Sequence, residues 1–584
     1  MYLKQTPNKK TGRIYLSICR GYHDKEKGYA RTVTVKKIGY LDEMEKEYED
    51  PVAHFNAVCD EMNAQEKAEK AEYTIKVRKD QELVKNVRGR KNFGYIVPMK
   101  IFYELGIDRF LLNHQRKNKI EHGTDSVMKL LVLSRILYPA SKRQTYIERG
   151  RYFDFEKEDL FSLQDIYRDL SYFAKLSERL QKFMHERIVK QYGRKLDLVY
   201  YDVTNYYFEI DKEDELRQKG YSKEHRPDPI VNMGLAIDRD GIPIAFEQFP
   251  GAESEKLHLR SMSRLLWQKF ETGKVIYVAD RAQNTGNNIY YIQSGKHGYV
   301  FGQSVLGGAG DLKKWIIDDN GYTPVYEDEE GKVLKYKRKS AIVDRVIDVS
   351  VIRDGKEATR KEQVKQKIVA FYSEKYAIRQ KAKREDVIIK AYHIMQDPAA
   401  YSKATHYGAL KYLKNIEIDK KTGKIKEQKA KPVFDFDKLA EEEKYDGYYA
   451  IVTNQFSMPD DEIIDIYHGL WQIEDCFRIT KSDIDTRPVY VSREDHIKAH
   501  FLTCFISLTI IRLIQKRLGG KYPVGQILEA LRNISCSRES ENFYLFDYRN
   551  DITEALGEGF GLDFNKERLT RGEIKKYLAM VKKG

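Results

Sequence analysis

The sequence predicts an α/β protein with a mixed sheet, in which three antiparallel strands precede parallel ones. The first observation is three segments rich in β-branched and aromatic residues between residues 196 and 249, the last two joined by the turn pair Asp240-Gly241. The second is the alternation that follows, in which helical segments separate the short apolar runs KVIYVAD and GYVFGQ. The third is a charged stretch, residues 306–444, which interrupts the sheet before YDGYYAIVTN resumes it.

The composition narrows the class of protein. A chain of 584 residues is too long for one small module, and 41% hydrophobic with 12% aromatic residues is too apolar for wholesale disorder. Five cysteines without a C-x-x-C pair argue against a disulfide framework and against a cysteine-based zinc site. The net charge of +14 favours a polyanionic partner.

Changes in pattern divide the chain into regions. The expected regions are a basic β-hairpin with a charged helix at 1–90, a helical domain at 91–192, an α/β core at 193–305 and 445–520, an insertion subdomain at 306–444, and a basic helical region at 521–584. The apolar segment 499–515 is short for a membrane span and carries His500 and Arg512, so we expect a core helix, no membrane and a cytoplasmic setting.

The first forty residues are the most basic part of the chain, with ten Lys or Arg against two acids. The segments RIYLSICR and ARTVTVKKIGYL are β-branched and partly alternating, which predicts a hairpin that can lie along a phosphate backbone. The alternative is a solvated edge hairpin whose lysines discourage aggregation. The candidate DNA-binding residues here are Lys9, Lys10, Arg13, Lys36 and Lys37.

Three carboxylates are candidates for chemistry because of their positions in or beside predicted strands and helices. Asp202 interrupts an apolar strand, Asp280 ends another, and Glu474 falls in the long helix expected after the insertion. Buried carboxylates are stable only when paired or bound to a cation, and oxygen ligands without cysteine or clustered histidine favour Mg²⁺ or Mn²⁺. A strand-end Asp can also simply cap a turn. We expect the three acids to converge and to hold two metal ions.

These motifs resemble the DDE transposases of bacterial insertion sequences, and among them the family-four group with the signature Y-x2-R-x3-E-x6-K. In this sequence the signature reads Tyr467, Leu470 where Arg is usual, Glu474 and Lys481. The stretches YYDVTNYYFE and VIYVADRAQNTGNN are similar to the first and second acidic motifs of these enzymes. GYSKEHRPDP, which holds Lys223 and Arg226, is similar to the stretch after the first acid.

The resemblance implies an RNase H-like core and metal-dependent cut-and-paste transposition. Asp202 bridges the two ions, about 3.5–4 Å apart, while Asp280 and Glu474 each complete one side. Strand nicking at the transposon ends is followed by transfer of the 3′-hydroxyl into target DNA, and a DNA hairpin can form on the way. Tyr467 and Lys481 are implied to hold the phosphate near the cut.

The helix around Glu474 can also be interpreted from spacing alone. Tyr467, Glu474 and Lys481 are seven residues apart, so on one regular helix they lie along a single face. Further DNA-contact candidates are Arg478, which could replace the missing arginine at position 470, and Arg281 after the second acid. Trp471 could stack on an extruded base, although a core position is favoured for it. A structural amphipathic helix and a salt-bridged surface face are the alternatives for the whole segment.

The leading hypothesis is therefore a DNA transposase with magnesium at its active site and manganese as a substitute. Its partners are double-stranded DNA, both the terminal inverted repeats and the target, and a second copy of the chain in the DNA complex. Two alternatives are a domesticated DNA-binding protein without catalysis and a two-metal nuclease without strand transfer. The expected location is the cytoplasm of a bacterium, on the nucleoid.

Overall fold

The chain forms two compact units, residues 1–87 and 88–584, and each is described by itself. The computed structural model describes residues 1–9, 11–24, 29–69, 82, 89–156, 160–223, 227–327, 334–353, 356–397, 401, 406, 408–416, 425, 431–539 and 542–583. The region boundaries expected at 192/193, 305/306, 444/445 and 520/521 all fall inside the second unit and stay predictions.

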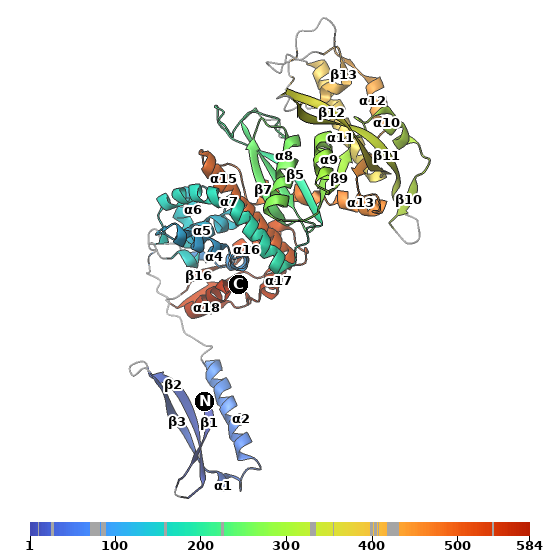
Figure 1. The fold of residues 1–584 in the computed structure, drawn as a ribbon. Helices are drawn as coiled ribbons and strands as arrows, with labels where there is room; N and C mark the ends of the chain where they lie inside the picture. Colours follow the sequence, from blue (N-terminus) through green and yellow to red (C-terminus); the bar gives the residue numbers. More distant parts are fainter. Residues whose placement is uncertain are drawn as a thin grey trace. The chain divides into compact units, whose positions relative to one another are not determined.

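The first unit is a three-stranded antiparallel sheet with a helix along it (Figure 1). The expected hairpin is present as β2 (Ile14–Asp24) and β3 (Tyr29–Tyr40), and β1 (Tyr2–Pro7) adds a third strand. The short helix α1 (Leu41–Met44) leads to α2 (Pro51–Glu69). The small core between sheet and helix contains Leu16, Ile18, Cys19, Phe55 and Cys59.

The second unit is built on a nine-stranded mixed sheet, as the sequence predicted in outline. The strands β5 (Leu198–Tyr207), β6 (Ile230–Ile237) and β7 (Pro243–Pro250) are antiparallel, and Gly241 turns the last hairpin with a φ of 75°. The strands β8 (Ile276–Ala279) and β9 (Gly298–Gln303) continue parallel to β5.

The strands of the expected insertion extend this same sheet. After β9 comes β15 (Tyr448–Thr453), followed by β12 (Lys356–Tyr372), β11 (Leu334–Arg353) and β10 (Thr323–Tyr326), all antiparallel. The long pair β11 and β12 therefore continues the core sheet because β12 pairs with β15. The helices α10 (Gly310–Ile317), α11 (Glu374–Gln396) and α12 (Phe436–Glu443) belong to the same stretch.

Helices cover both faces of the sheet. One face of β5, with Val199, Tyr201 and Val203, is buried against α8 (His258–Arg264) and α9 (Gly286–Ser294). The other face carries Leu198, Tyr200 and Tyr206 and belongs to the larger core. The helices of that core before β5 are α3 (Ile96–Glu104), α4 (Ile107–Lys117), α5 (Thr124–Leu137), α6 (Lys142–Ile147) and α7 (Leu163–Tyr192).

The helix predicted over Asp460–Asp483 is not continuous. α13 (Asp460–His468) ends at Gly469, α14 (Trp471–Arg478) follows, and a wider π-type turn, Ile479–Asp483, closes the segment. The break lies directly on the sheet, because a Cβ at position 469 would overlap the Tyr200 hydroxyl. Tyr467, Glu474 and Lys481 therefore lie in three successive segments, α13, α14 and the π-type turn.

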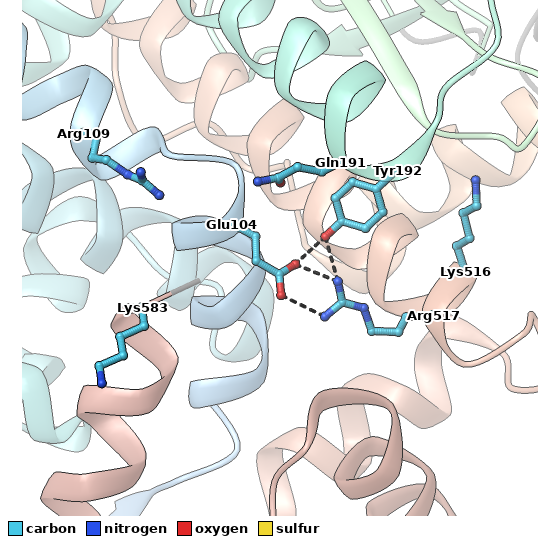
Figure 2. Close-up of a pocket in the computed structure, with 7 residues that line it drawn as sticks. All are labelled: Glu104, Arg109, Gln191, Tyr192, Lys516, Arg517 and Lys583. Atoms are coloured by element: carbon cyan, nitrogen blue, oxygen red, sulfur yellow. Dashed lines mark hydrogen bonds and ion pairs between the residues drawn. The ribbon is translucent and has the colours of Figure 1, made fainter.

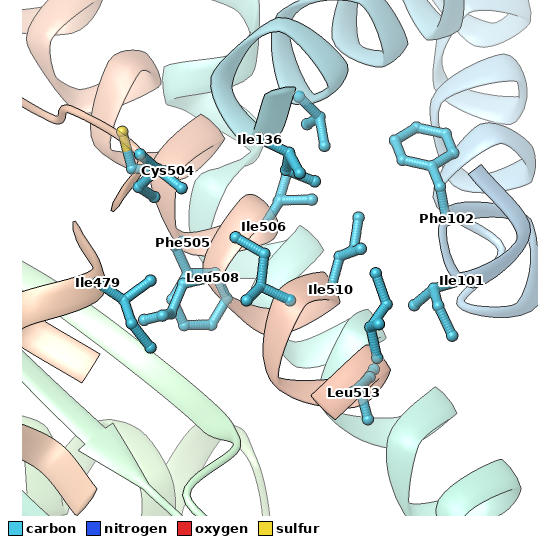
Figure 3. Close-up of a cluster of buried hydrophobic side chains, with 14 of the residues drawn as sticks. Ile101, Phe102, Ile136, Ile479, Cys504, Phe505, Ile506, Leu508, Ile510 and Leu513 are labelled. Carbon is cyan, nitrogen blue, oxygen red and sulfur yellow. The ribbon is translucent and has the colours of Figure 1, made fainter. Parts of the chain in front are cut away.

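The core helix of the unit is α15 (Glu494–Arg517). Figure 3 shows its side chains Phe505, Leu508 and Ile510 inside the buried cluster, with Ile101 and Phe102 of α3 on another side of it. Among the described residues it is the one helix long and apolar enough to cross a membrane, and 94% of its most apolar window is buried within the protein. That burial is the expected property of a core helix.

The end of the chain is not purely helical, contrary to expectation. Besides α16 (Val524–Asn533), α17 (Asp551–Phe560) and α18 (Arg571–Lys582), it contains β16 (Ser535–Arg538), β17 (Phe543–Phe546) and β18 (Arg568–Thr570). These strands form a small sheet with β4 (Arg90–Asn92). The first and last segments of the unit are thus joined, a pairing of distant segments that local sequence patterns do not reveal.

Candidate active site

Asp202 and Asp280 come from the region where the parallel strands β5 and β8 lie side by side. The register pairs Leu198 with Ile276 and Tyr200 with Val278; Asp202 lies two residues beyond the last pair on β5, and Asp280 directly follows β8. Side chains alternate along a strand, which places Asp202 on the same face as Tyr200, toward α13 and α14.

Asp202 is unusual in its environment. Its Oδ1 accepts a hydrogen bond from the Val203 amide at 2.7 Å. Burial, and the negative charges of Asp280 and Glu255, raise the pKa of Asp202 to about 7, although Lys223 opposes this rise. A carboxylate whose charge is this costly is a strong candidate for binding a cation.

A lysine and a third acid complete the described cluster around Asp202. The Lys223 Nζ lies 3.7 Å from Asp202 Oδ1 and 3.9 Å from an oxygen of Glu255, and it donates to the Val203 carbonyl. That same Glu255 oxygen is buried and accepts no hydrogen bond. Burial raises the pKa of Glu255, and Asp280 adds to this effect. Sequence reasoning missed Glu255 because it begins a three-residue 3-10 helix, Glu255–Leu257, which is too short to show a periodic pattern.

Asp280 also acts as a cap, which was the alternative role expected for an aspartate at the end of a strand. Its Oδ1 accepts from the Ala282 amide at 2.9 Å and so caps the short helix Arg281–Gln283. The exposed Arg281 follows it directly. Capping uses one carboxylate oxygen, which leaves the second oxygen of Asp280 for another ligand.

Tyr467 connects this cluster to the broken helix. A Cβ at Gly302 of β9 would overlap the Tyr467 hydroxyl, so the glycine lets the phenol approach the strand beside the Arg281 amide. Burial raises the pKa of Tyr467, and the charges of Asp280 and Glu474 contribute to the rise. The phenol is therefore within electrostatic range of both acids.

Glu474 is exposed on α14 and does not close on the two aspartates in this structure. Across the described residues, His, Cys, Asp and Glu side chains nowhere gather in threes in a way that could hold a metal ion. The adjacent residue Asp475 anchors the helix, because it accepts from Arg512 at 2.9 Å and from Arg478 at 2.9 and 3.0 Å. Asp280 is near enough to raise the pKa of Asp202, and the convergence of all three acids stays a prediction.

The donor set suits magnesium. Mg²⁺ is commonly bound through one or two carboxylates and completes its coordination with water and substrate phosphate. Asp202 and Asp280 supply two carboxylates, and Glu255, whose Oε1 pairs with Lys223 at 3.9 Å, lies near them. The ammonium group of Lys223 beside Asp202 shows that this position already attracts a cation.

The other predicted DNA-contact residues of the second unit differ in whether their side chains are ion-paired, exposed or packed in the core. Arg478 is bound by both Asp475 and Asp483, so its guanidinium is already neutralised. Trp471 is 61% exposed at the start of α14, so the core position favoured for it is wrong. Leu470 occupies the N-cap of α14 and packs against the core. Lys481 lies over the Tyr206 ring at 5.6 Å.

The basic residues of the first unit also differ from one another. Arg13 forms an ion pair with Asp42 at 2.8 Å and lies over the Tyr40 ring at 4.0 Å, which makes it part of the fold. Lys36 and Lys37 are exposed on β3, and Lys9 is exposed in the turn after β1. Lys10, and Arg226 of the second unit, fall outside the described residues.

A cavity of about 580 Å³ among the helices is a weaker candidate for chemistry. Figure 2 shows its carboxylate, Glu104, held by Arg517 at 2.7 and 3.0 Å and by the Tyr192 hydroxyl, which donates at 2.5 Å. Arg517 also donates to that hydroxyl at 3.0 Å. This closed network leaves Glu104 no open position for a metal or a proton transfer.

Comparison with known proteins gives one match to a family. Residues 3–74 match the IS1634 family transposase N-terminal domain. Curated protein sequences gave no significant match.

Two solved structures show weak likeness. The piggyBac transposase synaptic complex with hairpin DNA aligns at 6% identity and a TM-score of 0.35, covering 79% of this chain and 76% of that one. The Mos1 transposase paired-end complex with the left transposon end aligns at 12% identity and a TM-score of 0.13, covering 41% of this chain and 65% of that one. The first unit of this chain is thus similar to the N-terminal domain of insertion-sequence transposases, and that match supports an insertion-sequence transposase.

Proposed function

We propose that this protein is a DNA transposase that moves an insertion sequence by metal-dependent cleavage and strand transfer, with an RNase H-like core. Asp202 on β5 and Asp280 directly after the neighbouring parallel strand β8 carry the proposal, supported by the effect of Asp280 on the pKa of Asp202. The family match of residues 3–74 supports the choice of transposition among phosphoryl-transfer reactions.

In this proposal Asp202, Asp280 and Glu474 hold two Mg²⁺ ions, which Mn²⁺ can replace. When bound, the metal polarises the scissile phosphate and lowers the pKa of the attacking water or DNA 3′-hydroxyl. Glu474 joins the aspartates when DNA binds, because α14 presents it exposed beside the same face of the sheet. Lys223 leaves Asp202 and remains with Glu255, whose carboxylate is within the same reach.

DNA contacts in this proposal come from residues around the carboxylates. Arg281 and Tyr467 lie beside Asp280, and Lys481 follows Glu474 by two helical turns. Arg478 can bind phosphate only by exchanging its two carboxylate partners, so we assign it the orientation of α14. The double-stranded partners are the terminal repeats and the target. Two protomers act together, because two ends must be joined, and the reaction takes place on the bacterial nucleoid in the cytoplasm.

The test is a cleavage assay on plasmid DNA that carries the sequences flanking the coding region at both ends. We expect Asp202→Asn, Asp280→Asn and Glu474→Gln each to reduce Mg²⁺-dependent cleavage by at least about 10³-fold while end binding persists, since each removes a metal ligand. The matched control is Asp197→Asn, which changes an aspartate before β5 that pairs with Arg239 at 2.7 Å.

The outcomes separate the alternatives. Full cleavage by any of the three site variants would contradict the proposed site. Binding without cleavage in the unaltered protein indicates the non-catalytic DNA-binding protein. Cleavage without joined products, when 3′-hydroxyl ends and a target plasmid are supplied, indicates a nuclease.

A further inference from the structure

The cavity of about 580 Å³ in Figure 2 lies where several helices of the second unit end. α3 ends at Glu104, α7 at Tyr192, α15 at Arg517 and α18 at Lys582. The first turn of α4 adds Arg109 to the lining. None of the carboxylates assigned to DNA cleavage lines this cavity. Its chemistry can therefore be considered separately.

The lining of the cavity is strongly positive. It contains four cations and one acid, namely Arg109, Lys516, Arg517 and Lys583 against Glu104. The acid is already neutralised, because Arg517 binds both of its oxygens and the Tyr192 hydroxyl donates to it as well. Lys516 pairs at 2.6 Å with Asp240, which lies outside the lining. With both acids counted, positive charge still remains in excess around the cavity.

Arg517 keeps donors for a ligand despite its bonds to Glu104. Its Nη1 donates to one Glu104 oxygen at 3.0 Å, and its Nη2 donates to the other at 2.7 Å and to the Tyr192 hydroxyl at 3.0 Å. A guanidinium carries five N–H groups, so this network leaves the Nε hydrogen and one Nη1 hydrogen. The guanidinium also lies over the Phe560 ring, with its central carbon 4.6 Å from the ring centroid. Arg517 is therefore held in place before any ligand binds.

Helix dipoles explain only part of this cluster of cations. A cation at the C-terminal end of a helix interacts favourably with the helix dipole, which can account for Lys516, Arg517 and Lys583. Arg109 lies instead in the first turn of α4, where a cation opposes the dipole. Burial raises the pKa of the adjacent Asp108, although Arg109 opposes the rise. An external anion would compensate the charge of Arg109.

We propose that this cavity binds a small ligand with two or more linked phosphate groups. Figure 2 shows Arg109 and Lys583 on one side of Glu104, with Lys516 and Arg517 on the other side. Two separate pairs of cations match an anion whose charges are spread along a short chain. Arginine binds phosphate oxygens through its fork of N–H donors, and lysine binds them as a point charge. The volume is in the range of pockets that hold one small ligand.

The inference goes beyond the proposed function and does not depend on it, so it is tested without metal. Isothermal titration calorimetry of the full chain in EDTA measures the binding of inorganic tripolyphosphate. We expect Arg109→Gln and Lys583→Gln each to weaken binding about tenfold, since each removes a charge-assisted hydrogen bond. Arg109→Lys should keep part of the affinity, because it keeps the charge but loses the fork. The melting temperature of the unaltered protein should rise with tripolyphosphate concentration.

The matched controls remove the same charge from the same two helices. Arg116 of α4 and Lys575 of α18 are exposed and lie outside the lining, so Arg116→Gln and Lys575→Gln should bind tripolyphosphate as the unaltered protein does. Circular dichroism and the melting temperature without ligand check that each variant is folded. Asp202→Asn should also leave binding unchanged, so failure of the cleavage proposal and failure of this inference give different results.

Four results would overturn the inference. The first is an absence of tripolyphosphate binding by the unaltered protein. The second is an equal loss of affinity in the cavity variants and in the controls, which would indicate an effect of net charge. The third is equal affinity for inorganic orthophosphate, which would mean that linked phosphates are not recognised. The fourth is weaker binding of a DNA duplex by Arg109→Gln and Lys583→Gln with unchanged tripolyphosphate binding, which would assign the cavity to the DNA backbone.

Discussion

At the scale of single residues, the raised pKa of Asp202 is the most informative feature, because it shows that ionisation of this buried carboxyl group is unfavourable. Its pKa of about 7 means that the folded protein binds a proton which the unfolded chain, with an ordinary aspartate, releases near pH 4. Protonation of Asp202 therefore stabilises the fold. This contribution is complete below pH 4 and is lost as the pH rises through 7. Above pH 7 the charged carboxylate therefore destabilises the metal-free fold.

The first prediction at this scale concerns Asp202→Asn. We expect this variant to be more stable than the unaltered protein by about 2 kcal/mol at pH 8 in EDTA, with little difference at pH 4. Three pKa units correspond to about 4 kcal/mol, reduced because 21% of the side chain reaches water. Urea unfolding at both pH values measures the difference. The control is Asp197→Asn, and a gain that does not depend on pH would contradict the explanation.

The second prediction concerns Lys223, which competes with a metal for Asp202. We expect Lys223→Met to bind Mn²⁺ about tenfold more tightly at pH 8.5 in the absence of DNA, because an opposing positive charge is removed. Glu255→Gln should weaken Mn²⁺ binding, since it leaves the ammonium group with Asp202 alone. Isothermal titration calorimetry measures both constants.

The matched control for Lys223 is Lys219→Met, four residues earlier and exposed. If Lys223 serves only to hold a DNA phosphate, Lys223→Met leaves the Mn²⁺ affinity unchanged and weakens only DNA binding. That result would remove the competition model while keeping the carboxylate site.

At the scale of elements, the broken helix after the insertion changes how the signature residues can act. On one straight helix Tyr467, Glu474 and Lys481 would face the same way. The break at Gly469 instead lets Tyr467 reach β9 while α14 carries Glu474 separately. Arg512 of α15 holds α14 through Asp475, whereas the pair of Arg478 with Asp475 lies within α14 itself, so a movement of α14 that brings Glu474 toward the aspartates acts against the Arg512 pair.

The strand β3 is the element of the first unit best placed to bind a phosphate backbone, because Lys36 and Lys37 are exposed on it while Arg13 is engaged in the fold. We expect Lys36→Ala with Lys37→Ala to weaken duplex DNA binding and to lower the slope of log affinity against log salt by about 1–2. Fluorescence anisotropy at several salt concentrations gives the slope.

The control for β3 removes the same charge elsewhere. Lys381 and Lys383 are exposed on α11 of the second unit, and their double replacement by Ala is expected to change the slope less. An equal loss in both double variants would mean that net charge, and not β3, drives the binding.

At the scale of the whole molecule, the second unit is organised around one sheet. This sheet joins regions that the sequence order suggested were separate. The charged stretch expected to form an insertion subdomain contributes β10, β11 and β12 to the same nine-stranded sheet. The apolar helix α15, near the C-terminal end, is the centre of a core shared with α3, α5 and α7 from the beginning of the unit. Residues 88–584 thus fold as one body around distant contacts.

Local features of the chain could be predicted well from sequence. The β-branched runs, the Asp240-Gly241 turn, the apolar helix 494–517 and the basic hairpin all follow from propensity and periodicity, which act over a few residues. The placement of Asp202 within one strand and of Asp280 directly after another could also be predicted, because both stand in short apolar runs.

Only the tertiary structure decided the features that depend on distant pairings. Glu255 and Lys223 join Asp202 through loop packing, the helix breaks where Gly469 meets Tyr200, and strands from the expected insertion complete the sheet. The sequence by itself determined which segments become strands and helices and which of them carry charge. Pairing register and side-chain packing between residues far apart in the chain determined which charges meet, because no local period encodes those contacts.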